Sequence, residues 1–378
     1  MSDRLQIAEL KAFVFRAPLA APVQTSFGLM LDRPMVLVRA TDRDGVVGWG
    51  EVWCNFPAVG AEHRARLVAS ILSPLVTAQS FDNPADAFQK LTAATAVMAI
   101  QCAEPGPFAQ AIAGIDTALN DLCARRAGLP LWKHLGGKNG RVAVYASGLN
   151  PTEPERLAAQ KQAAGYNAFK LKIGFGRDRD IGNLKALRDH LGGDVRLMVD
   201  ANQAWSIKDA LAMLPALAEF DLDWLEEPLR ADRSWHEWKR LASATSIPIA
   251  AGENVMGTDA FAAAIASKAL GVVQPDLAKW GGLSACLPLA RSVMTAGLRF
   301  CPHYLGGGIG LLASAHLLAA AGGDGALEID ANPNPLRSEI ARVCGTVADG
   351  HVELGDAPGL GVENPLLAIE PFSVAVTA

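Results

Sequence analysis

The chain has 378 residues, half of them hydrophobic and 19% charged, so it can bury the core of one large domain or of two ordinary ones. Its net charge of -5 and the lack of a basic block argue against nucleic acid or a membrane surface as partner, and the polar start and short apolar runs predict a cytoplasmic protein. Its cysteines form no CxxC pair, which indicates free thiols in a reducing compartment: Cys54, Cys102, Cys123, Cys286, Cys301 and Cys344.

The first part of the chain, residues 1–135, predicts an α+β domain. "LQIAELKAFVFRAP" and "PMVLVRATDRDGVVGWGEV" alternate like strands of an antiparallel sheet, with "TDRDG" as a turn. Helical patterns follow, among them "AIAGIDTALNDLCARRAG". The tail, residues 331–378, is rich in Pro and Gly, and we expect it to pack back on this first domain.

The middle part, residues 136–330, alternates short apolar runs with amphipathic helical patterns. The runs are "RVAVYASG", "FKLKIG", "VRLMVDAN", "DWLEEP", "IPIAAGEN", "GVVQPDL", "LRFCPHY" and "ALEID". Eight buried strands with intervening helices predict a (β/α)8 barrel, in the α/β class. A doubly wound open sheet is the alternative, but no Gly-rich nucleotide loop follows the first strand.

Ionisable residues end seven successive strands of the predicted barrel. Enzymes with this fold place their active sites at the carboxyl ends of the strands. A single charged residue at a strand end can simply be exposed to water, whereas charged residues at the ends of seven successive strands indicate an active site. They are Lys170 and Lys172, Asp200, Glu226 and Glu227, Glu253, Asp276 with Lys279, His303, and Glu328.

Three adjacent strands each supply a carboxylate: Asp200, Glu226 and Glu253. Three acids that converge repel one another, and a divalent cation removes this repulsion. Hard oxygen ligands favour Mg2+, or Mn2+ as the second choice. The alternative is that these acids form ion pairs with arginines or with the lysines across the barrel.

Candidate bases stand on both sides of this site. Lys172 is expected to face its centre, and Lys170 beside it, with a nearby cation, would lower the pKa of Lys172 toward neutrality. His303 is the second candidate base, and Asp276 is placed to bind its other ring nitrogen. Glu328, if protonated, would donate to an oxyanion. This set suits removal of a proton α to a carboxylate through an enediolate.

The motifs "KLK", "DAN", "EEP", "GEN", "QPDLAKWGG", "CPH" and "LE", in this order, resemble the mandelate racemase subgroup of the enolase superfamily. The resemblance spans nearly the whole chain. It implies a modified (β/α)8 TIM barrel with one Mg2+, under an α+β capping domain formed by the N-terminal part and the C-terminal tail.

Carried over position by position, the resemblance implies the following roles. Asp200, Glu226 and Glu253 match the metal ligands, with Asn202 and Asn254 as supporting residues. Lys172 matches one base, with Lys170 as a substrate contact, and His303 with Asp276 matches the opposite base. Glu328 matches the acid that binds the enediolate. Lys279 stands near the base of the muconate-lactonizing subgroup and is interpreted as structural, and Asn120 replaces a frequent Trp, which affects packing more than mechanism.

Two capping loops are expected to select the substrate. They offer Gln24, Thr25, Ser26, Trp53, Asn55 and Phe56. Neither loop tip supplies a clear cation, and Arg33 and His63 are interpreted as solvated, so a monocarboxylate with hydroxyl groups or an apolar part is favoured over a diacid. A homo-oligomer is expected.

The favoured reaction is dehydration of a sugar acid, a hydroxy acid. Racemisation or epimerisation and lactone cycloisomerisation need the same residues and stay open. A Schiff-base barrel aldolase using Lys172 is the alternative from another enzyme class, and it would not need three carboxylates. A non-catalytic binding barrel is the third hypothesis. His236, His316 and Cys301 are interpreted as surface or packing residues.

Overall fold

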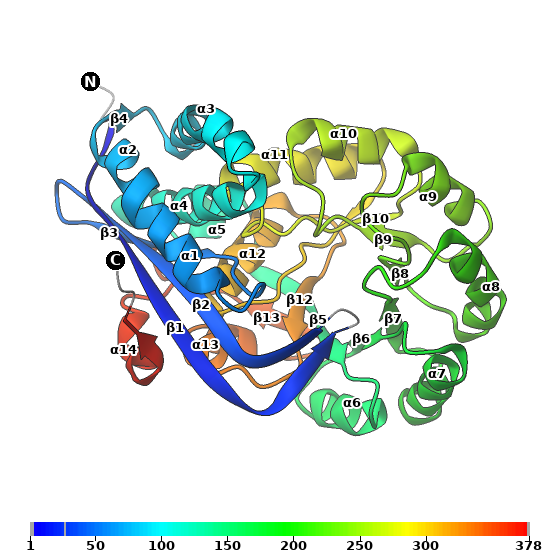
Figure 1. Cartoon of the computed structure of the whole chain (residues 1–378). Helices are drawn as coiled ribbons and strands as arrows, with labels where there is room; N and C mark the ends of the chain where they lie inside the picture. Colours follow the sequence, from blue (N-terminus) through cyan, green and yellow to red (C-terminus); the bar gives the residue numbers. More distant parts are fainter. Residues whose placement is uncertain (1–3, 26–27, 376–378) are drawn as a thin grey trace.

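An antiparallel sheet covered by helices forms the N-terminal part of the protein (Figure 1). The computed structural model describes residues 4–25 and 28–375. The sheet has the order β14-β1-β2-β3, with β4 paired to β1. Its first four strands are β1 (Leu5–Thr25), β2 (Gly28–Asp42), β3 (Val47–Val52) and β4 (Ser80–Phe81). The helices are α1 (Gly60–Leu67), the π-helix η1 (Val68–Leu72), α2 (Ser73–Thr77), α3 (Pro84–Gln101), α4 (Pro105–Arg126) and α5 (Leu131–His134).

The predicted turn between β2 and β3 is confirmed, and its own carboxylate closes it. Asp42 Oδ1 accepts the backbone N–H of Asp44 at 2.9 Å and that of Val46 at 2.8 Å. Such a side-chain turn gives the two strands a short, defined connection. It therefore helps to set the β2–β3 pairing that carries the chain to the loop after Val52.

Eight parallel strands form the second part, in the order β11-β10-β9-β8-β7-β6-β5-β12, which confirms the predicted barrel. Within the described residues, no backbone ladder joins β11 to β12. The strands are β5 (Arg141–Leu149), β6 (Ala168–Lys172), β7 (Arg196–Asp200), β8 (Leu225–Glu226), β9 (Ile249–Ala251), β10 (Val272–Val273), β11 (Arg299–Phe300) and β12 (Leu327–Asp330).

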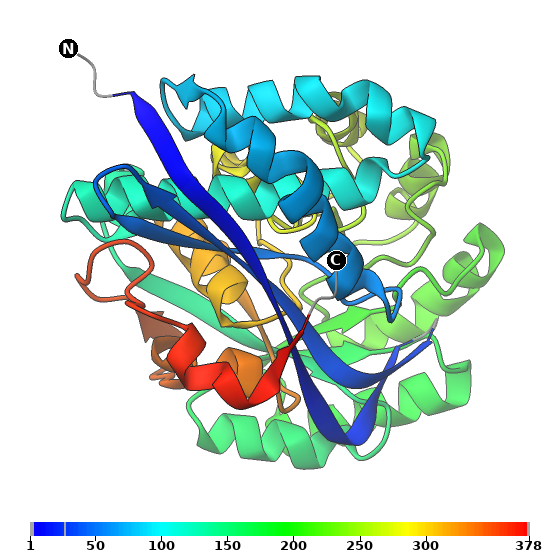
Figure 2. The ribbon, with the colours of Figure 1, turned by 60° about the vertical axis from the view of Figure 1, so that its left-hand side comes forward.

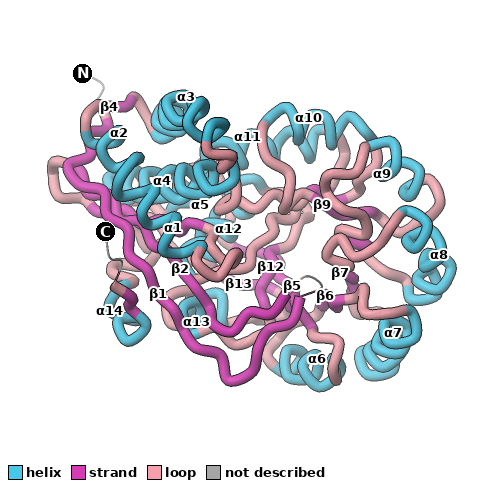
Figure 3. The backbone as a smooth tube through the Cα atoms, in the orientation of Figure 1, coloured by secondary structure: helices cyan, strands magenta, loops and turns pink. Residues whose placement is uncertain are grey.

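Helices alternate with these strands and lie on the outside of the curled sheet (Figure 3). Their apolar faces pack on the strands in one large core. None of the helices in the described part of the chain is long and apolar enough to cross a membrane. They are α6 (Pro154–Ala163), α7 (Arg177–Leu191), α8 (Ile207–Leu217), the 3-10 turn η2 (Ala218–Phe220), α9 (Trp235–Ala242), α10 (Thr258–Ser267), α11 (Gly282–Thr295) and α12 (Gly308–Ala321).

The C-terminal segment returns to both parts, as Figure 2 shows for its last turn beside β1. β13 (His351–Glu353) pairs antiparallel with β5, and β14 (Ser373–Val374) pairs antiparallel with β1. The pairing of β14 with β1 joins the tail to the N-terminal sheet. The domain boundaries at residues 135 and 330 stay predictions. Between the two strands and before them lie α13 (Pro335–Ser338), η3 (Arg342–Gly345), α14 (Leu366–Ile369) and η4 (Glu370–Phe372).

Candidate active site

An apolar layer fills the inside of the barrel and supports the candidate site. It contains Tyr145, Ala168, Met198, Trp224, Ala250, Val272, Cys301 and Ala326. Residues two apart along a strand share a face, so the next inward positions lie directly above this layer. Those positions are Ser147, Lys170, Asp200, Glu226, Gly252, Gln274, His303 and Glu328. The strand period therefore brings the predicted ionisable residues together at the carboxyl ends of the strands.

Lys170 is fully buried and lies between two carboxylates. Its Nζ is 2.6 Å from Glu226 Oε1 and 2.8 Å from Glu328 Oε1. Burial alone would lower the pKa of the ammonium, but Glu226 and Glu328 raise this pKa well above its usual value. Lys170 is therefore a fixed positive charge at the floor of the site.

Lys172, two residues on, reaches the edge of the site. Its Nζ donates to Asp200 Oδ2 at 2.5 Å and to Asn202 Oδ1 at 2.9 Å. Burial and Lys170 lower the pKa of Lys172, as expected, but Asp200 outweighs them and the pKa is raised. The predicted lowering, which includes a cation bound beside Lys172, stays a prediction, and Asp200 is the counter-ion of Lys172 in this arrangement.

The three predicted metal ligands lie on neighbouring strands β7, β8 and the end of β9. Each is engaged by cationic or amide groups: Asp200 by Lys172, Glu226 by Lys170 and Gln274, and Glu253 by His303 and Lys279. In the described ranges, no three His, Cys, Asp or Glu side chains converge closely enough to hold a metal ion as they stand. The ion-pair alternative therefore describes their contacts in this structure.

Glu227 adds a fourth carboxylate to which the sequence argument gave no role. Its φ of +40° is in the left-handed region, a strained conformation for a residue with a side chain. Asn254 donates to its Oε1 at 2.8 Å, while its buried Oε2 finds no hydrogen-bond donor among the residues that the structure describes. Burial, then Glu253 and Asp200, raise the pKa of Glu227 well above its usual value. An unpartnered buried acceptor among acidic neighbours fits a cation site, and its oxygens are the hard donors that Mg2+ prefers.

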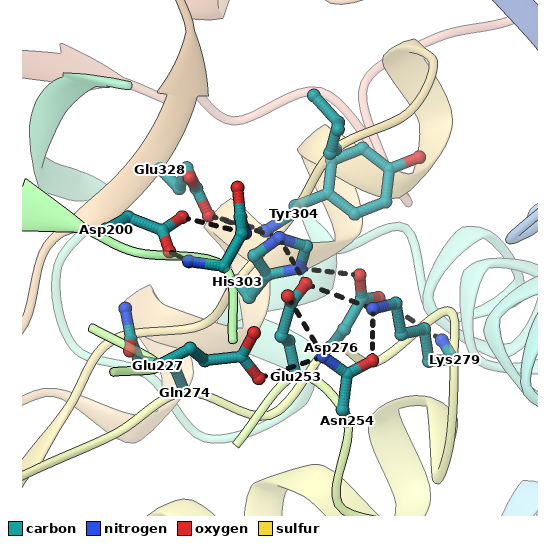
Figure 4. Close-up of polar contacts among 12 residues, drawn as sticks. Asp200, Glu227, Glu253, Asn254, Gln274, Asp276, Lys279, His303, Tyr304 and Glu328 are labelled. Carbon is teal, nitrogen blue, oxygen red and sulfur yellow. Dashed lines mark hydrogen bonds and ion pairs between the residues drawn. The ribbon is translucent and has the colours of Figure 1, made fainter. Parts of the chain in front are cut away.

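His303 and Asp276 form the predicted pair on the far side of the site (Figure 4). His303 Nδ1 is 2.8 Å from Asp276 Oδ2, and Nε2 is 2.7 Å from Glu253 Oε2. Burial alone would lower the pKa of the imidazole, but Glu253, Glu328 and Asp276 raise it well above its usual value. Asp276 also accepts the N–H of Ala278 at 2.9 Å, which holds its carboxylate in place.

Glu328 is ionised in this arrangement. Burial alone would raise its pKa, but Lys170, His303 and Lys172 lower it to about 2. Ser147 donates a short hydrogen bond to its Oε1, and the backbone N–H of Tyr304 donates to Oε2 at 3.1 Å. The expected protonated Glu328 is therefore not what this charge pattern favours.

A cavity of about 280 Å³ connects these groups with the capping loops. Trp53, Asn55 and Phe56 line it, as predicted, together with residues that the sequence argument missed. Four of the missed residues carry amide or hydroxyl groups and lie within or after strands, outside the recognised motifs, so no local signal singled them out. They are Ser147, Asn150, Gln203 and Asn332.

Several other predicted positions lie outside the cavity or outside the described part of the structure. Arg33 is buried, with a nitrogen 2.7 Å from Asp330 Oδ2, and His63 Nε2 is 3.2 Å from Glu104, so neither is simply solvated. Asn120 donates to Asp116 and Ser284 where α4 meets α11, a packing position as expected. The side chains of Gln24 and Thr25, and all of Ser26, lie outside the described part of the structure.

Lys279 lines the cavity, although it was interpreted as structural. Its Nζ is 3.0 Å from Glu253 Oε2, 3.1 Å from Asn254 Oδ1 and 4.9 Å from the centre of the Trp53 ring. It therefore joins a predicted metal ligand to a capping loop. The Lys279 ammonium faces the indole ring of Trp53, which is a cation–π contact and a favourable place for a lysine.

Most of the chain matches two known protein-family models. Residues 8–136 match the family described as mandelate racemase/muconate lactonizing enzyme, N-terminal domain, and residues 153–365 match the one described as enolase C-terminal domain-like. An arabinonate dehydratase of Saccharolobus solfataricus is 30% identical over 343 residues, which cover 88% of this chain and 89% of the relative. Other relatives are named as a cycloisomerase, an epimerase and racemases.

Solved structures agree with these matches. A protein of Bordetella bronchiseptica RB50 named mandelate racemase/muconate lactonizing enzyme is 56% identical, with a TM-score of 0.93 over 97% of this chain and 99% of that chain. A racemase from Streptomyces coelicolor A3(2), described with bound magnesium, is 28% identical, with a TM-score of 0.86 over 97% of this chain and 100% of that one.

Proposed function

Because the chain belongs to the mandelate racemase/muconate lactonizing enzyme family of the enolase superfamily, we propose that it removes a proton α to the carboxylate of a small hydroxy acid. One observation carries this proposal. Lys172 and His303, from strands distant in the barrel order, border the same cavity of about 280 Å³, and Asp276 binds His303 from behind. Two bases across one cavity suit proton abstraction from either face of a carbon acid.

Asp200, Glu226 and Glu253 would hold a divalent cation, Mg2+ or alternatively Mn2+, with Asn202 and Asn254 beside them. Their oxygen donors and the unpartnered Glu227 Oε2 nearby support this assignment. When bound, the cation supplies positive charge that stabilises the enediolate.

The lysines have separate roles in this proposal. Lys170 binds the substrate carboxylate as a fixed cation, since its own charge is maintained by Glu328 and Glu226. Lys172 removes the proton. With Asp200 bound to the cation, its charge would no longer offset the charge on Lys172. Burial and Lys170 would then lower the pKa of Lys172.

His303 acts from the opposite side. Asp276 fixes its tautomer and orientation, and Glu328 lies 3.8 Å from its Nε2. In a dehydration, His303 in its protonated form donates to the leaving hydroxyl at the β carbon. In a racemisation or epimerisation, it exchanges the α proton with Lys172.

We favour dehydration of a sugar acid among the reactions of the family. The support is the cavity lining, in which amides and a hydroxyl outnumber cations, so it suits several substrate hydroxyls and one carboxylate. A relative named arabinonate dehydratase agrees with this choice. Racemisation or epimerisation and lactone cycloisomerisation are the alternatives. A Schiff-base aldolase is disfavoured, because it would not need the three carboxylates at the ends of neighbouring strands.

The test is proton NMR of the purified protein in D2O with Mg2+ and a panel of sugar acids, other hydroxy acids and amino acids. We expect loss of water to a 2-keto-3-deoxy product. Deuterium at the α position of an otherwise unchanged acid would instead show a racemase or epimerase. Lys172→Ala and EDTA should both abolish turnover, while Lys208→Ala, an exposed lysine on α8, should not. Turnover that persists in EDTA, with trapping by borohydride, would overturn the proposal in favour of the aldolase.

A further inference from the structure

Glu51, on β3 of the capping domain, is a buried carboxylate that the proposed mechanism does not use. Its Oε1 accepts the backbone N–H of Gly307 at 2.5 Å, and its Oε2 accepts that of Gly310 at 2.9 Å. The hydroxyl of Tyr304 is a third hydrogen-bond partner. Glu51 thus binds the amino-terminal end of α12, where free N–H groups and the helix dipole favour a negative charge.

The glycine-rich sequence "LGGGIG" after His303 is explained by this contact. A Cβ at Gly307 would overlap the Met35 sulfur and would approach Glu51 Oε1 to 2.8 Å. A Cβ at Gly306 or at Gly310 would overlap the Tyr304 hydroxyl. The glycines therefore let the backbone approach Glu51 and Tyr304 closely.

The segment that follows β3 also contacts the loop after His303, at Leu305. Asn55, four residues after Glu51, donates from Nδ2 to the carbonyl oxygen of Leu305 at 2.6 Å. Inside the barrel, Glu328 accepts the N–H of Tyr304 at 3.1 Å. Each residue from 304 to 307 thus has a backbone group tied to an element other than its own loop, with Asn334 donating to Gly306 at 2.9 Å.

We propose that Glu51 is a positioning residue for His303, through which the capping domain sets where the imidazole stands in the cavity. β11 ends at Phe300 and α12 begins at Gly308, so His303 lies in a connection whose far end is held by Glu51. The barrel holds the near end, where His303 donates its N–H to the carbonyl of Pro275 at 3.2 Å. Loss of the Glu51 charge weakens the hold on the far end at Gly307 and Gly310, while the backbone contacts of residues 304 to 306 remain. The catalytic part of this inference depends on the proposed function.

The test compares Glu51→Gln with Asp121→Asn. Gln keeps the shape of Glu51 and removes the charge. Asp121 is a matched control, because it is also a buried capping-domain carboxylate that accepts two backbone N–H groups, from Trp49 at 2.8 Å and from Leu360 at 2.7 Å, outside the His303 loop. Tyr304→Phe, which removes only the hydroxyl, serves as second variant if Glu51→Gln does not fold.

The first readout needs no substrate. The proton–carbon NMR signal of the His303 ring is assigned by its loss in His303→Asn. We expect this signal to shift or broaden in Glu51→Gln and to stay unchanged in Asp121→Asn. An unchanged signal in Glu51→Gln and in Tyr304→Phe would overturn the proposal. This readout remains decisive if no acid of the panel reacts with the native protein, which would count against the proposed function alone.

The second readout separates the two bases. Exchange of the α proton of the reactive acid for deuterium measures the Lys172-dependent step. Loss of the β hydroxyl in a dehydration, or α-proton exchange from the opposite face in a racemisation, measures the His303-dependent step, with Lys172→Ala and His303→Asn as references. Misplacement of a catalytic group by about 1 Å costs on the order of 10²-fold, so we expect the His303-dependent rate to fall ~10- to 100-fold in Glu51→Gln. The Lys172-dependent rate should change less than about twofold, in contrast to the ~10²-fold scale of a misplaced group. An equal loss on both sides would show a merely structural role and overturn the proposal.

Discussion

At the scale of a single residue, Lys279 would compete with a bound metal ion for a carboxylate of the proposed site. Its ammonium lies 3.0 Å from Glu253 Oε2, and both side chains are nearly buried. A cation bound by Glu253 must therefore share this carboxylate with Lys279 and with His303. The stem of Lys279 also supports Trp53, so removal of its charge and removal of its packing are separable.

We expect Lys279→Met to bind Mg2+ more tightly than the native protein. Met keeps an apolar stem under Trp53 and removes the competing charge. A competing ion pair of ~1 kcal/mol corresponds to about a fivefold gain in affinity. Isothermal titration calorimetry with Mg2+ measures the change, with Lys208→Met as the control. A weaker affinity in Lys279→Met would show that the lysine organises the ligands more than it competes with the metal.

His316 is expected to make the protein sensitive to acid. Its Nδ1 accepts the backbone N–H of Trp132 at 3.0 Å, which requires a neutral ring. Burial lowers its pKa to about 3. The unfolded chain then takes up a proton first, so stability contributed by neutral His316 is present above the ordinary pKa of about 6.5 and is lost as pH falls toward 3.

Urea unfolding at several pH values checks this expectation. Between pH 6.5 and 4, we expect His316 to contribute a loss of up to ~1.4 kcal/mol per pH unit to the free energy of unfolding. His316→Gln should be less stable at pH 7.5 but should show a flatter pH dependence. His190→Gln, at an exposed position on α7, should keep the native slope. A native slope in His316→Gln would assign the acid sensitivity to other groups.

At the scale of an element, the first turn of α11 is capped by a side chain from the capping domain. Asp116 on α4 accepts the N–H of Leu283 at 2.7 Å and that of Ser284 at 3.0 Å, so a capping-domain side chain caps a barrel helix. Gly282 has a φ of +53°, and a Cβ there would overlap the Asp116 carboxylate. The second glycine of "KWGG", Gly282, is thus required by the contact between α4 and α11.

Gly282→Ala is expected to destabilise the protein by ~2–4 kcal/mol, because it combines a left-handed backbone with a clash against Asp116. Gly182→Ala is the matched comparison. Gly182 lies within α7, and a Cβ there would meet nothing within 4 Å, so alanine should stabilise the helix by ~0.5–1 kcal/mol. Chemical denaturation of both variants measures the difference. Equal effects would contradict the close approach of Asp116 to α11.

At the scale of the whole molecule, the candidate site joins the barrel, the capping domain and the C-terminal segment. Its acidic residues come from strands β7 and β8 and from the segment after β9, and Lys170, Lys172, Lys279 and His303 offset their repulsion. A ligand that binds only the folded chain stabilises it by mass action, by ~2.7 kcal/mol at 100 times its dissociation constant. Metal binding should therefore appear in global stability.

We expect Mg2+ to raise the melting temperature and EDTA to remove the gain. Asp200→Asn, at a proposed ligand, should lose this response to Mg2+. Asp189→Asn, at an exposed position on α7, should keep it. Differential scanning calorimetry with and without Mg2+ gives the comparison. A full Mg2+ response in Asp200→Asn would exclude this residue as a ligand.

The sequence by itself determined the barrel and the residues at its strand ends. Eight buried runs predicted eight parallel strands, and all eight are present. The strand period of two then placed Lys170, Asp200 and His303 on the inner face. These predictions succeeded because strand pattern and side-chain alternation are local properties of the chain. The family resemblance, now supported by matches over residues 8–136 and 153–365, came from the same strand ends.

Only the tertiary structure decided which groups act on one another across the molecule. It placed Lys279 under Trp53, left Glu227 Oε2 without a partner, and brought Glu51 to the end of α12. It also placed Asp200 against Lys172 as a counter-ion that raises the pKa of this lysine, a contact that no sequence spacing predicts. Charge effects and close backbone approaches depend on distances between segments far apart in the chain, and those distances exist only once the strands, the helices and the capping domain are packed together.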